Sequence, residues 1–293
     1  MAVTAQQVKI LRERTGAGMM ECKKALVAAD GDVDAAAEQM RKSGLARADK
    51  KAGRVAAEGV IVIRMSDDGA TAAIAEVNCE TDFVANGEAF RGFADGVAEA
   101  ALGARTADLD ALLNRSVAGE TIEERRRSLV ATLGENIRVR RFDRLTSQGS
   151  LGHYLHGSRI GVIVALEGGD EALARDLAMH VAASSPAYIT AEEVPAEMLA
   201  KEREILREQA ATEGKPPAIV EKMVEGRLGK YLGAITLLGQ PFVKDDQILV
   251  AKLVEQRGAR VTGFRRYEVG EGIEKPEDDF VAEVMKQVRG ASG

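Results

Sequence analysis

Histidine and cysteine, two residue types that often carry out catalysis or bind metals, are sparse in this chain of 293 residues. Its three histidines (His153, His156 and His180) and two cysteines (Cys22 and Cys79) do not have the spacing of a Cys/His zinc motif. No phosphate-binding loop, nucleophile elbow or HExxH motif occurs in the sequence. We therefore expect His180 and both cysteines to be buried structural side chains. We expect neither an enzyme nor a bound metal or cofactor.

One short segment, EVNCETDFVA, places an aromatic side chain beside a carboxylate. It leaves an apolar strand and enters a predicted loop at residues 78–87. A large aromatic such as Phe83 next to Asp82, in a loop held by a hairpin and a helix, is typical of a side chain presented to a partner. The alternative is that Phe83 packs into its own core with Phe90 and Phe93. Taken alone, the pattern of residues favours this alternative.

The first 44 residues predict three short helices. Thr4 with Gln7 forms a capping box before the first apolar positions, and Gly44 is placed to end the third helix. Helices this short are not stable alone, so they must pack as a small bundle. The helices are expected at about residues 5–15, 19–29 and 33–43, followed by a helical or flexible linker at 45–58.

The next part of the chain shows one pattern twice. Two runs of strand-like residues flank the turn Ser66–Gly69, and an amphipathic helix with Phe90 and Phe93 follows. A second hairpin, with its turn at Gly157, is again followed by an apolar helical stripe. The pattern predicts an α+β core of two related hairpin-and-helix subdomains, residues 55–143 and 144–275.

A helical hairpin is predicted as an insertion at about residues 187–232. Its charged sequence carries few apolar positions, so it should project from the body as an antiparallel coiled coil. The residues leave three roles open for it: joining two copies as a homodimer or 2:2 assembly, holding part of a partner, or neither. A helix at 248–254, a strand at 259–269 and a C-terminal helical module at 276–293 should follow.

The charge is uneven along the chain. It has 40 Lys and Arg against 46 Asp and Glu, a net charge of −6, whereas residues 1–54 are basic. The acidic total argues against a general DNA or RNA binder, and no long apolar run predicts a membrane span or secretory signal, so we expect a cytoplasmic protein. The alternative function is an RNA or protein adaptor that uses the basic head: Lys23, Lys24, Arg41, Lys42, Lys50 and Lys51.

Several motifs, in order along the chain, resemble the bacterial translation elongation factor Ts family. EVNCETDFVA at residues 76–85 is the most specific of them. The others are VKILRERTGAGMMECKKAL (8–26), MRKSGLARADKKAGRVAAEG (40–59), LGENIRVRR (133–141), YLHGSRIGVIV (154–164), AMHVAASSP (178–186), GQPFVKDD (239–246) and FRRYEVGEGIEKPEDDFVAEV (264–284).

This resemblance implies a fold and a function. The fold is an N-terminal three-helix bundle of the ubiquitin-associated type (residues 1–54), two α+β subdomains, an inserted coiled coil and a C-terminal helix. The function is guanine-nucleotide exchange on the GTPase elongation factor Tu, with displacement of magnesium and release of GDP, and without nucleotide binding by this chain. A scaffold that binds the GTPase without exchange stays an alternative.

The resemblance also assigns roles to single residues. The motif of Thr81, Asp82, Phe83 and Val84 is associated with displacement of the partner's magnesium. The implied partner contacts are Met19, Met20, Lys23, Gly134, His156, Val281 and Met285.

Overall fold

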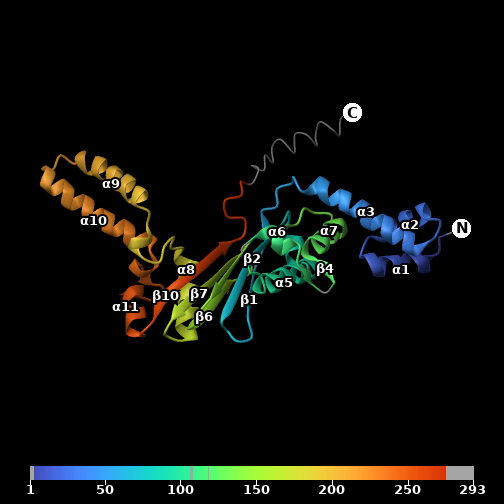
Figure 1. Ribbon diagram of the computed structural model, residues 1–293. Helices are drawn as coiled ribbons and strands as arrows, with labels where there is room; N and C mark the ends of the chain where they lie inside the picture. The colour runs from blue at the N-terminus through green and yellow to red at the C-terminus, as the bar shows by residue number, and fades with distance from the viewer. Residues whose placement is uncertain (1–2, 106–107, 118, 275–293) are drawn as a thin grey trace, which may run out of the picture.

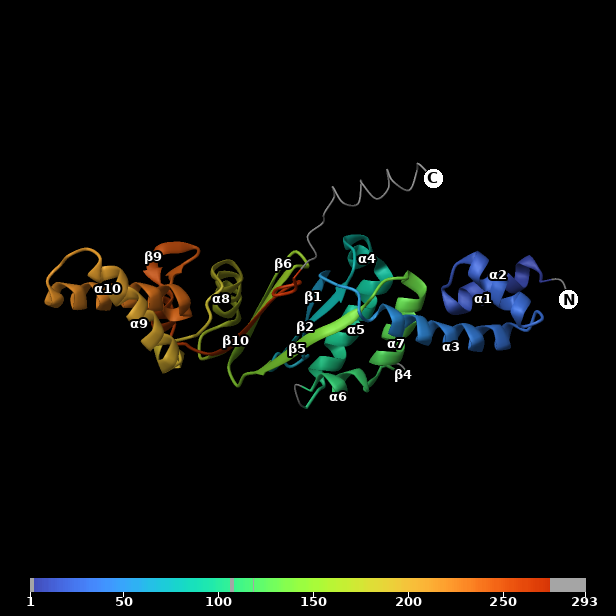
Figure 2. The same cartoon turned by 90° about the horizontal axis from the view of Figure 1, so that it is seen from above.

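The computed structural model describes residues 3–105, 108–117 and 119–274. The molecule is elongated (Figures 1 and 2): a helical bundle lies at one end, two three-stranded β-sheets lie in the middle, and a pair of long helices projects at the other end. Helices and antiparallel strands occupy separate layers, which confirms the predicted α+β class.

The N-terminal bundle consists of α1 (Ala5–Thr15), α2 (Met19–Ala28) and α3 (Val33–Lys51). The predicted capping box begins α1: the Thr4 hydroxyl accepts the Gln7 N–H at 3.2 Å, and the Gln7 side chain accepts the Thr4 N–H at 2.8 Å. The helices bury one small apolar core, which is formed by Val8, Leu11, Ala17, Cys22, Leu26 and Ala36.

Helix α3 does not end at Gly44, so that prediction is wrong; it continues to Lys51. A glycine inside a helix costs only about 1 kcal/mol relative to alanine. Helix α3 packs against α7 (Ile122–Leu133) of the central part, and this tertiary contact outweighs the local stop signal. The helix therefore connects the bundle to the central sheets, and of the two alternatives for the linker, helical or flexible, the helical one holds as far as Lys51.

The first sheet has the strand order β1-β2-β5, and all pairs are antiparallel. Its strands are β1 (Glu58–Met65), β2 (Thr71–Cys79) and β5 (Arg138–Thr146), and the predicted turn at Ser66–Gly69 joins the first two. Helix α5 (Glu88–Leu102) covers one face of this sheet. The apolar stripe of α5 is buried there, as its spacing predicts: Phe90, Phe93, Ala94, Val97 and Ala101.

Between α5 and β5 the chain forms small elements that close the end of this layer. These are α6 (Leu109–Leu113), β3 (Ser116–Val117), β4 (Glu120–Thr121) and α7. A second capping box begins α7, because the Thr121 hydroxyl accepts the Glu124 N–H at 3.1 Å and Glu124 accepts the Thr121 N–H at 2.9 Å.

The second sheet has the strand order β10-β7-β6. Its strands are β6 (Ser150–His156), β7 (Ile160–Glu167) and β10 (Arg260–Glu268), and α8 (Glu171–Ser184) covers one face. The connections repeat those of the first sheet. In each, a hairpin is followed by a covering helix, and a later strand pairs with the second strand of the hairpin.

The two sheets pack on each other through the faces that α5 and α8 leave uncovered. At Gly161 they approach so closely that an added Cβ would lie 2.4 Å from Ile61 Cγ2. The apolar residues at this contact come from both sheets: Ile61, Ile63, Ala72 and Ile74 from the first, and Leu151, Ile163, Ala165 and Tyr267 from the second. The central part of the molecule is therefore four layers: helix, sheet, sheet, helix.

The projecting pair consists of α9 (Ala196–Ala211) and α10 (Pro217–Ile235), which pack antiparallel. Their shared apolar contact is narrow and is formed by Leu206, Ala210, Val220, Val224 and Leu228. Three ion pairs cross between the helices: Arg203–Glu225, Arg207–Glu221 and Arg227–Glu213.

Short elements return the chain from this pair to the second sheet. They are η2 (Leu237–Gly239), β8 (Pro241–Phe242), β9 (Asp245–Leu249) and α11 (Val250–Gln256); η1 (Ala191–Glu193) precedes α9. The predicted helix start at Ile248 is wrong. Strand β9 pairs with β8 through Leu249, so the helix begins at Val250.

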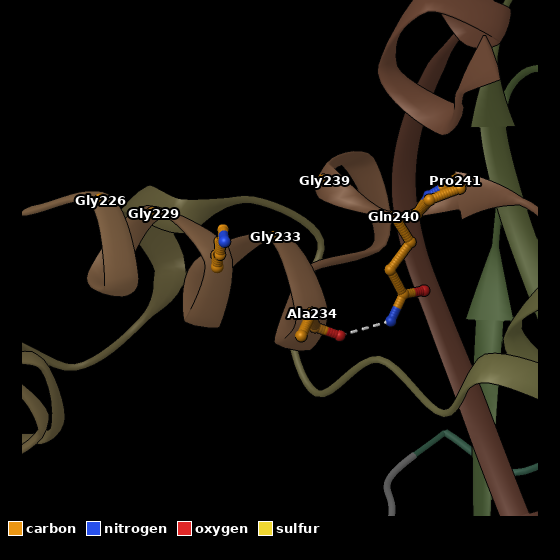
Figure 3. A pocket seen from close by; sticks show the side chains of 8 residues that line it. Gly226, Gly229, Gly233, Ala234, Gly239, Gln240 and Pro241 are labelled. Carbon is orange, nitrogen blue, oxygen red and sulfur yellow. Dashed lines mark hydrogen bonds between the residues drawn. The ribbon is translucent and has the colours of Figure 1, made fainter. Parts of the chain in front are cut away.

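His180 attaches the helical pair to the second sheet. Its Nε2 lies 2.9 Å from Gln240 Oε1, and its Nδ1 accepts the Val243 N–H at 3.1 Å. Burial lowers the pKa of His180, so the ring is neutral, which confirms a structural histidine. Gln240 donates to the Ala234 carbonyl at 2.6 Å (Figure 3). A pocket of about 550 Å³ lies beside this bond. Four glycines line it (Gly226, Gly229, Gly233 and Gly239), together with Lys230, Ala234, Gln240 and Pro241.

Candidate partner-binding site around Phe83

Phe83 projects into solvent. Its side chain is 87% exposed, whereas Phe90 and Phe93 are buried under the first sheet. The arrangement in which Phe83 joins its own core with these two residues is therefore wrong. An aromatic side chain left in water on an otherwise well packed surface is a common mark of an interaction site.

A short helix turns this side chain outward. The expected loop at residues 78–87 instead contains the end of β2 and helix α4 (Asp82–Asn86). The Thr81 hydroxyl caps α4 by accepting the Val84 N–H at 3.4 Å. Ala85 is buried and Val84 is half-buried, so the inner side of α4 faces the core. The acidic and aromatic side chains of the motif are left on its outer side.

A carboxylate from a distant part of the chain clamps the start of α4. Glu135 Oε2 accepts the N–H groups of Glu80 at 3.1 Å and of Thr81 at 3.0 Å, and its Oε1 accepts the Thr81 hydroxyl at 2.6 Å. Gly134 ends α7 in the left-handed backbone conformation (φ 81°), which residues other than glycine rarely adopt. The end of α7 therefore directs Glu135 at the motif.

In a second set of hydrogen bonds the acceptor is Glu80, and the donor lies in the segment that carries Glu135. Glu80 Oε1 accepts the Asn136 N–H at 2.6 Å, and the Arg54 guanidinium lies 3.5 Å from the other oxygen of Glu80. The buried Asn136 amide donates to the Arg54 carbonyl at 2.7 Å. Three chain segments are thus tied together beneath α4, and the platform that carries Phe83 is rigid.

Both cysteines are buried. Burial, with the Glu135 carboxylate nearby, raises the pKa of Cys79 to about 12, and the thiol donates to the Thr81 carbonyl at 3.1 Å. Cys22 is buried between the N-terminal helices. The expectation that both are buried is confirmed.

The N-terminal contacts expected from the resemblance lie on the outer side of α2. Met19 is 57% exposed and Met20 is 66% exposed, and Lys23 is also exposed. Cys22 and Leu26 on the opposite side of the helix are buried. This helix therefore presents two flexible apolar side chains and one cation at the end of the molecule.

Gly134 and His156 are also exposed, and both lie on segments tied to the first sheet. Lys51 donates to the Gly134 carbonyl. His156 ends β6, and in the turn that follows it Arg159 donates to Glu58 of β1 at 2.6 Å. The turn after His156 is therefore held against the strand that pairs with β2, which leads to α4.

The structure brings some of the expected residues together and not others. Gly134 adjoins the Thr81–Val84 motif through Glu135, whereas His156 lies on the second sheet and the exposed methionines lie on the N-terminal bundle. Val281 and Met285 fall outside the described residues. Sequence reasoning missed Glu135; its only signal was its place after Gly134 in the LGENI motif.

Within 3–105, 108–117 and 119–274, His, Cys, Asp and Glu side chains form no group of three or more that could hold a metal ion. Over the same residues, every helix is too short or too polar to cross a membrane.

Comparisons with known proteins agree with the motif resemblance. A family model described as Elongation factor TS matches residues 80–271. The elongation factor Ts of Halorhodospira halophila is 59% identical over 289 residues, which make up 99% of each chain. That of Thioalkalivibrio sulfidiphilus is 58% identical over 99% of this chain and 100% of its own, and that of Methylococcus capsulatus is 59% identical over 99% of both. The chain belongs to the elongation factor Ts family.

Membership of the elongation factor Ts family makes the protein a translation elongation factor and confirms the resemblance drawn from its motifs. The matched residues begin at Glu80, so they include the Thr81–Val84 motif, Glu135 and His156. The N-terminal bundle precedes the matched residues but is covered by the full-length relatives.

Proposed function

We propose that this protein is a guanine-nucleotide exchange factor that binds elongation factor Tu and releases GDP from it. One observation carries the proposal: in a chain of the elongation factor Ts family, Phe83 stands exposed on a helix that Glu135 clamps. Exposure of a phenylalanine forgoes about 1.5–3 kcal/mol of burial, which becomes available when a partner covers it.

The mechanism follows from differential binding. A GTPase holds GDP through backbone amides, a lysine and a magnesium ion that bridges phosphate oxygens. An exchange factor must bind the nucleotide-free form more tightly than the nucleotide-bound form. Linkage then requires GDP to weaken the factor by the same coupling free energy. We infer that Phe83 enters an apolar crevice of the GTPase near its nucleotide site and shifts the groups that align the ion.

The other motif residues support this insertion. Thr81 caps α4 and Val84 packs inward, so both keep the helix in place. Asp82 is exposed beside Phe83. A single carboxylate is a poor magnesium site, because magnesium requires near-octahedral coordination. We therefore assign Asp82 to fixing the displaced elements of the GTPase, and the ion's displacement is indirect.

The coupling free energy that exchange requires is larger than burial of Phe83 can supply, so further contacts are needed. A thousandfold coupling needs about 4 kcal/mol, and one phenylalanine supplies about 1.5–3 kcal/mol. We call the inserted Phe83 side chain the wedge. Contacts elsewhere on the docking surface must supply the remaining coupling free energy. We assign that role to the exposed residues Met19, Met20, Lys23, Gly134 and His156, and to Val281 and Met285 of the C-terminal motif, which lie outside the described residues.

The roles of docking and nucleotide release fall to different segments of the chain. We propose that residues 1–54 dock the GTPase, that residues 55–143 carry the wedge, and that residues 144–275 add a second contact surface and the helical hairpin. Residues 276–293 would add a further contact. The GTPase itself holds the nucleotide and the ion, so this chain supplies binding energy and no catalytic side chain.

Stopped-flow release of a fluorescent GDP analogue from elongation factor Tu tests the proposal. Phe83→Ala should slow stimulated release by about 10- to 100-fold, the factor that corresponds to about 1.5–3 kcal/mol of lost burial. Because the side chain is exposed, thermal stability should not change. Leu249→Ala, which truncates an exposed apolar side chain on β9, serves as the control. Unchanged release with Phe83→Ala would refute the wedge, and no stimulation by the wild type would refute the exchange function.

A further inference from the structure

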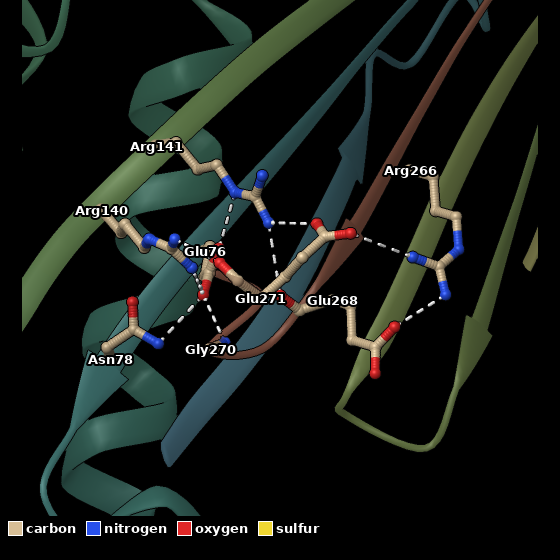
Figure 4. A network of polar contacts seen from close by, with 8 residues as sticks. All are labelled: Glu76, Asn78, Arg140, Arg141, Arg266, Glu268, Gly270 and Glu271. Atoms are coloured by element: carbon tan, nitrogen blue, oxygen red, sulfur yellow. Dashed lines mark hydrogen bonds and ion pairs between the residues drawn. The ribbon is translucent and has the colours of Figure 1, made fainter. Parts of the chain in front are cut away.

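A fully buried carboxylate lies between the two sheets. Glu76 belongs to β2, in the row of side chains that faces the second sheet, where Ala72 and Ile74 are apolar. Burying a carboxylate is unfavourable unless donors surround it. Four donors do so (Figure 4): Arg141 Nε at 2.6 Å, the Gly270 N–H at 2.8 Å, and Arg140 Nη1 and Asn78 Nδ2 at 3.0 Å each.

These donors keep Glu76 ionised. Burial by itself would raise the pKa of Glu76, but the bonds from Gly270, Asn78 and the two arginines outweigh it and hold the pKa below its usual range. The group is therefore a permanent anion at the joint between the sheets. Its bonds are charge-assisted and directional, unlike the apolar contacts around it.

A β-bulge builds this cluster. Glu76 pairs with Arg141, but the next residue, Val77, pairs with Val139, so Arg140 is an extra residue in β5. Adjacent side chains in a regular strand point to opposite faces of a sheet. The bulge removes that alternation and lets Arg140 and Arg141 both reach one carboxylate.

The cluster also holds the chain that leaves the second sheet. Gly270, just beyond β10, has φ 75°, and a Cβ added there would lie 2.4 Å from the Ala57 carbonyl oxygen. Only glycine therefore fits where the N–H donates to Glu76. On the same side, Arg141 pairs with Glu271 at 3.1 Å, and its guanidinium lies 4.2 Å from the Tyr267 ring centroid.

Strands β2 and β5 meet at Glu76. They lead to the two parts of the Phe83 platform, which are α4 with its cap Thr81 and the clamp residue Glu135. Beyond Glu76, β2 continues to Cys79, two residues before the cap residue Thr81, and β5 begins at Arg138, three residues after the clamp residue Glu135. On the other side of the joint is the sheet that carries His156. The cluster therefore lies between the wedge and a second exposed surface.

We propose that Glu76 is a positioning residue for nucleotide exchange: it fixes the angle between the Phe83 platform and the second sheet, so that both can contact the GTPase together. This inference rests on the proposed function. The apolar contacts between the sheets are not directional. The ion pairs Arg159–Glu58 and Arg265–Asp143 also cross between the sheets but are partly exposed, whereas Glu76 is fully buried. Without the ionic cluster, docking through the N-terminal bundle persists while correct placement of the wedge becomes less frequent.

The experiment compares Glu76→Gln and Arg140→Gln with a matched control, Glu123→Gln. Glu123 also pairs with two arginines at 2.7 Å, but within the single helix α7. GDP release from elongation factor Tu is measured against factor concentration to separate the maximal rate from the half-saturating concentration. We expect the maximal rate to fall about tenfold for Glu76→Gln and about threefold for Arg140→Gln, with little change in the half-saturating concentration, because misplacement of a reacting group lowers turnover steeply.

A double-mutant cycle separates positioning from general weakening. If Glu76 acts through the wedge, Glu76→Gln should lower the maximal rate no further in a Phe83→Ala background. Equal maximal rates for Glu76→Gln and wild type, additive effects in the cycle, or an equal loss with Glu123→Gln would each overturn the inference. Should Glu76→Gln fail to fold by circular dichroism, Arg140→Gln decides alone in the same way. Failure of the wild type to release GDP would instead refute the proposed function.

Discussion

Glu135 allows the rigidity of the Phe83 platform to be tested directly. Glu135→Ala removes the acceptor of three hydrogen bonds, from the Glu80 N–H, the Thr81 N–H and the Thr81 hydroxyl. A hydrogen bond to a charged group contributes about 1.5–3 kcal/mol when buried, and about 1 kcal/mol is a fair value where the freed donors can bond to water. The three bonds together then contribute about 3 kcal/mol, which corresponds to a roughly hundredfold increase in local opening.

Hydrogen–deuterium exchange measures that opening. In Glu135→Ala, amides in residues 80–86 should exchange roughly a hundredfold faster, while most of the protein keeps its protection because the site is peripheral. Stimulated GDP release should slow in parallel, since Phe83 no longer stands on a fixed helix. Glu124→Ala is the matched control, because Glu124 makes comparable bonds to Thr121 at the start of α7. The reasoning is refuted if protection at residues 80–86 is unaltered in Glu135→Ala.

Two further predictions concern the bundle and a buried histidine. Removing residues 1–51 should weaken capture of elongation factor Tu in a pull-down but leave the sheets folded by circular dichroism, because the bundle has its own core; loss of the strand signal would contradict this. Burial lowers the pKa of His180, so below about pH 6.5 the unfolded chain binds a proton that the folded chain does not. The free energy of unfolding in urea should therefore fall from about pH 6.5 to 5, and less steeply in His180→Gln; equal slopes would count against it.

Local signals predicted most elements, because each involves residues a few positions apart. The capping box at Thr4 and the turn at Ser66–Gly69 form as expected. The errors arose where a distant contact overrode or added to a local signal. Helix α3 continues past Gly44 because it packs on α7. Helix α4 forms where a loop was expected, and Glu135 holds the start of this helix.

The candidate site divides in the same way. Residue patterns along the chain identify the family motifs and the Thr81–Val84 segment and contain no catalytic motif, but they leave open whether Phe83 points inward or outward. Tertiary structure alone decided that Phe83 is exposed, since Glu135 lies 54 residues from Thr81, and it alone placed Gly270 on Glu76 across 194 residues. Sequence spacing carries no information about such pairs; strand register and the bulge at Arg140 bring them together.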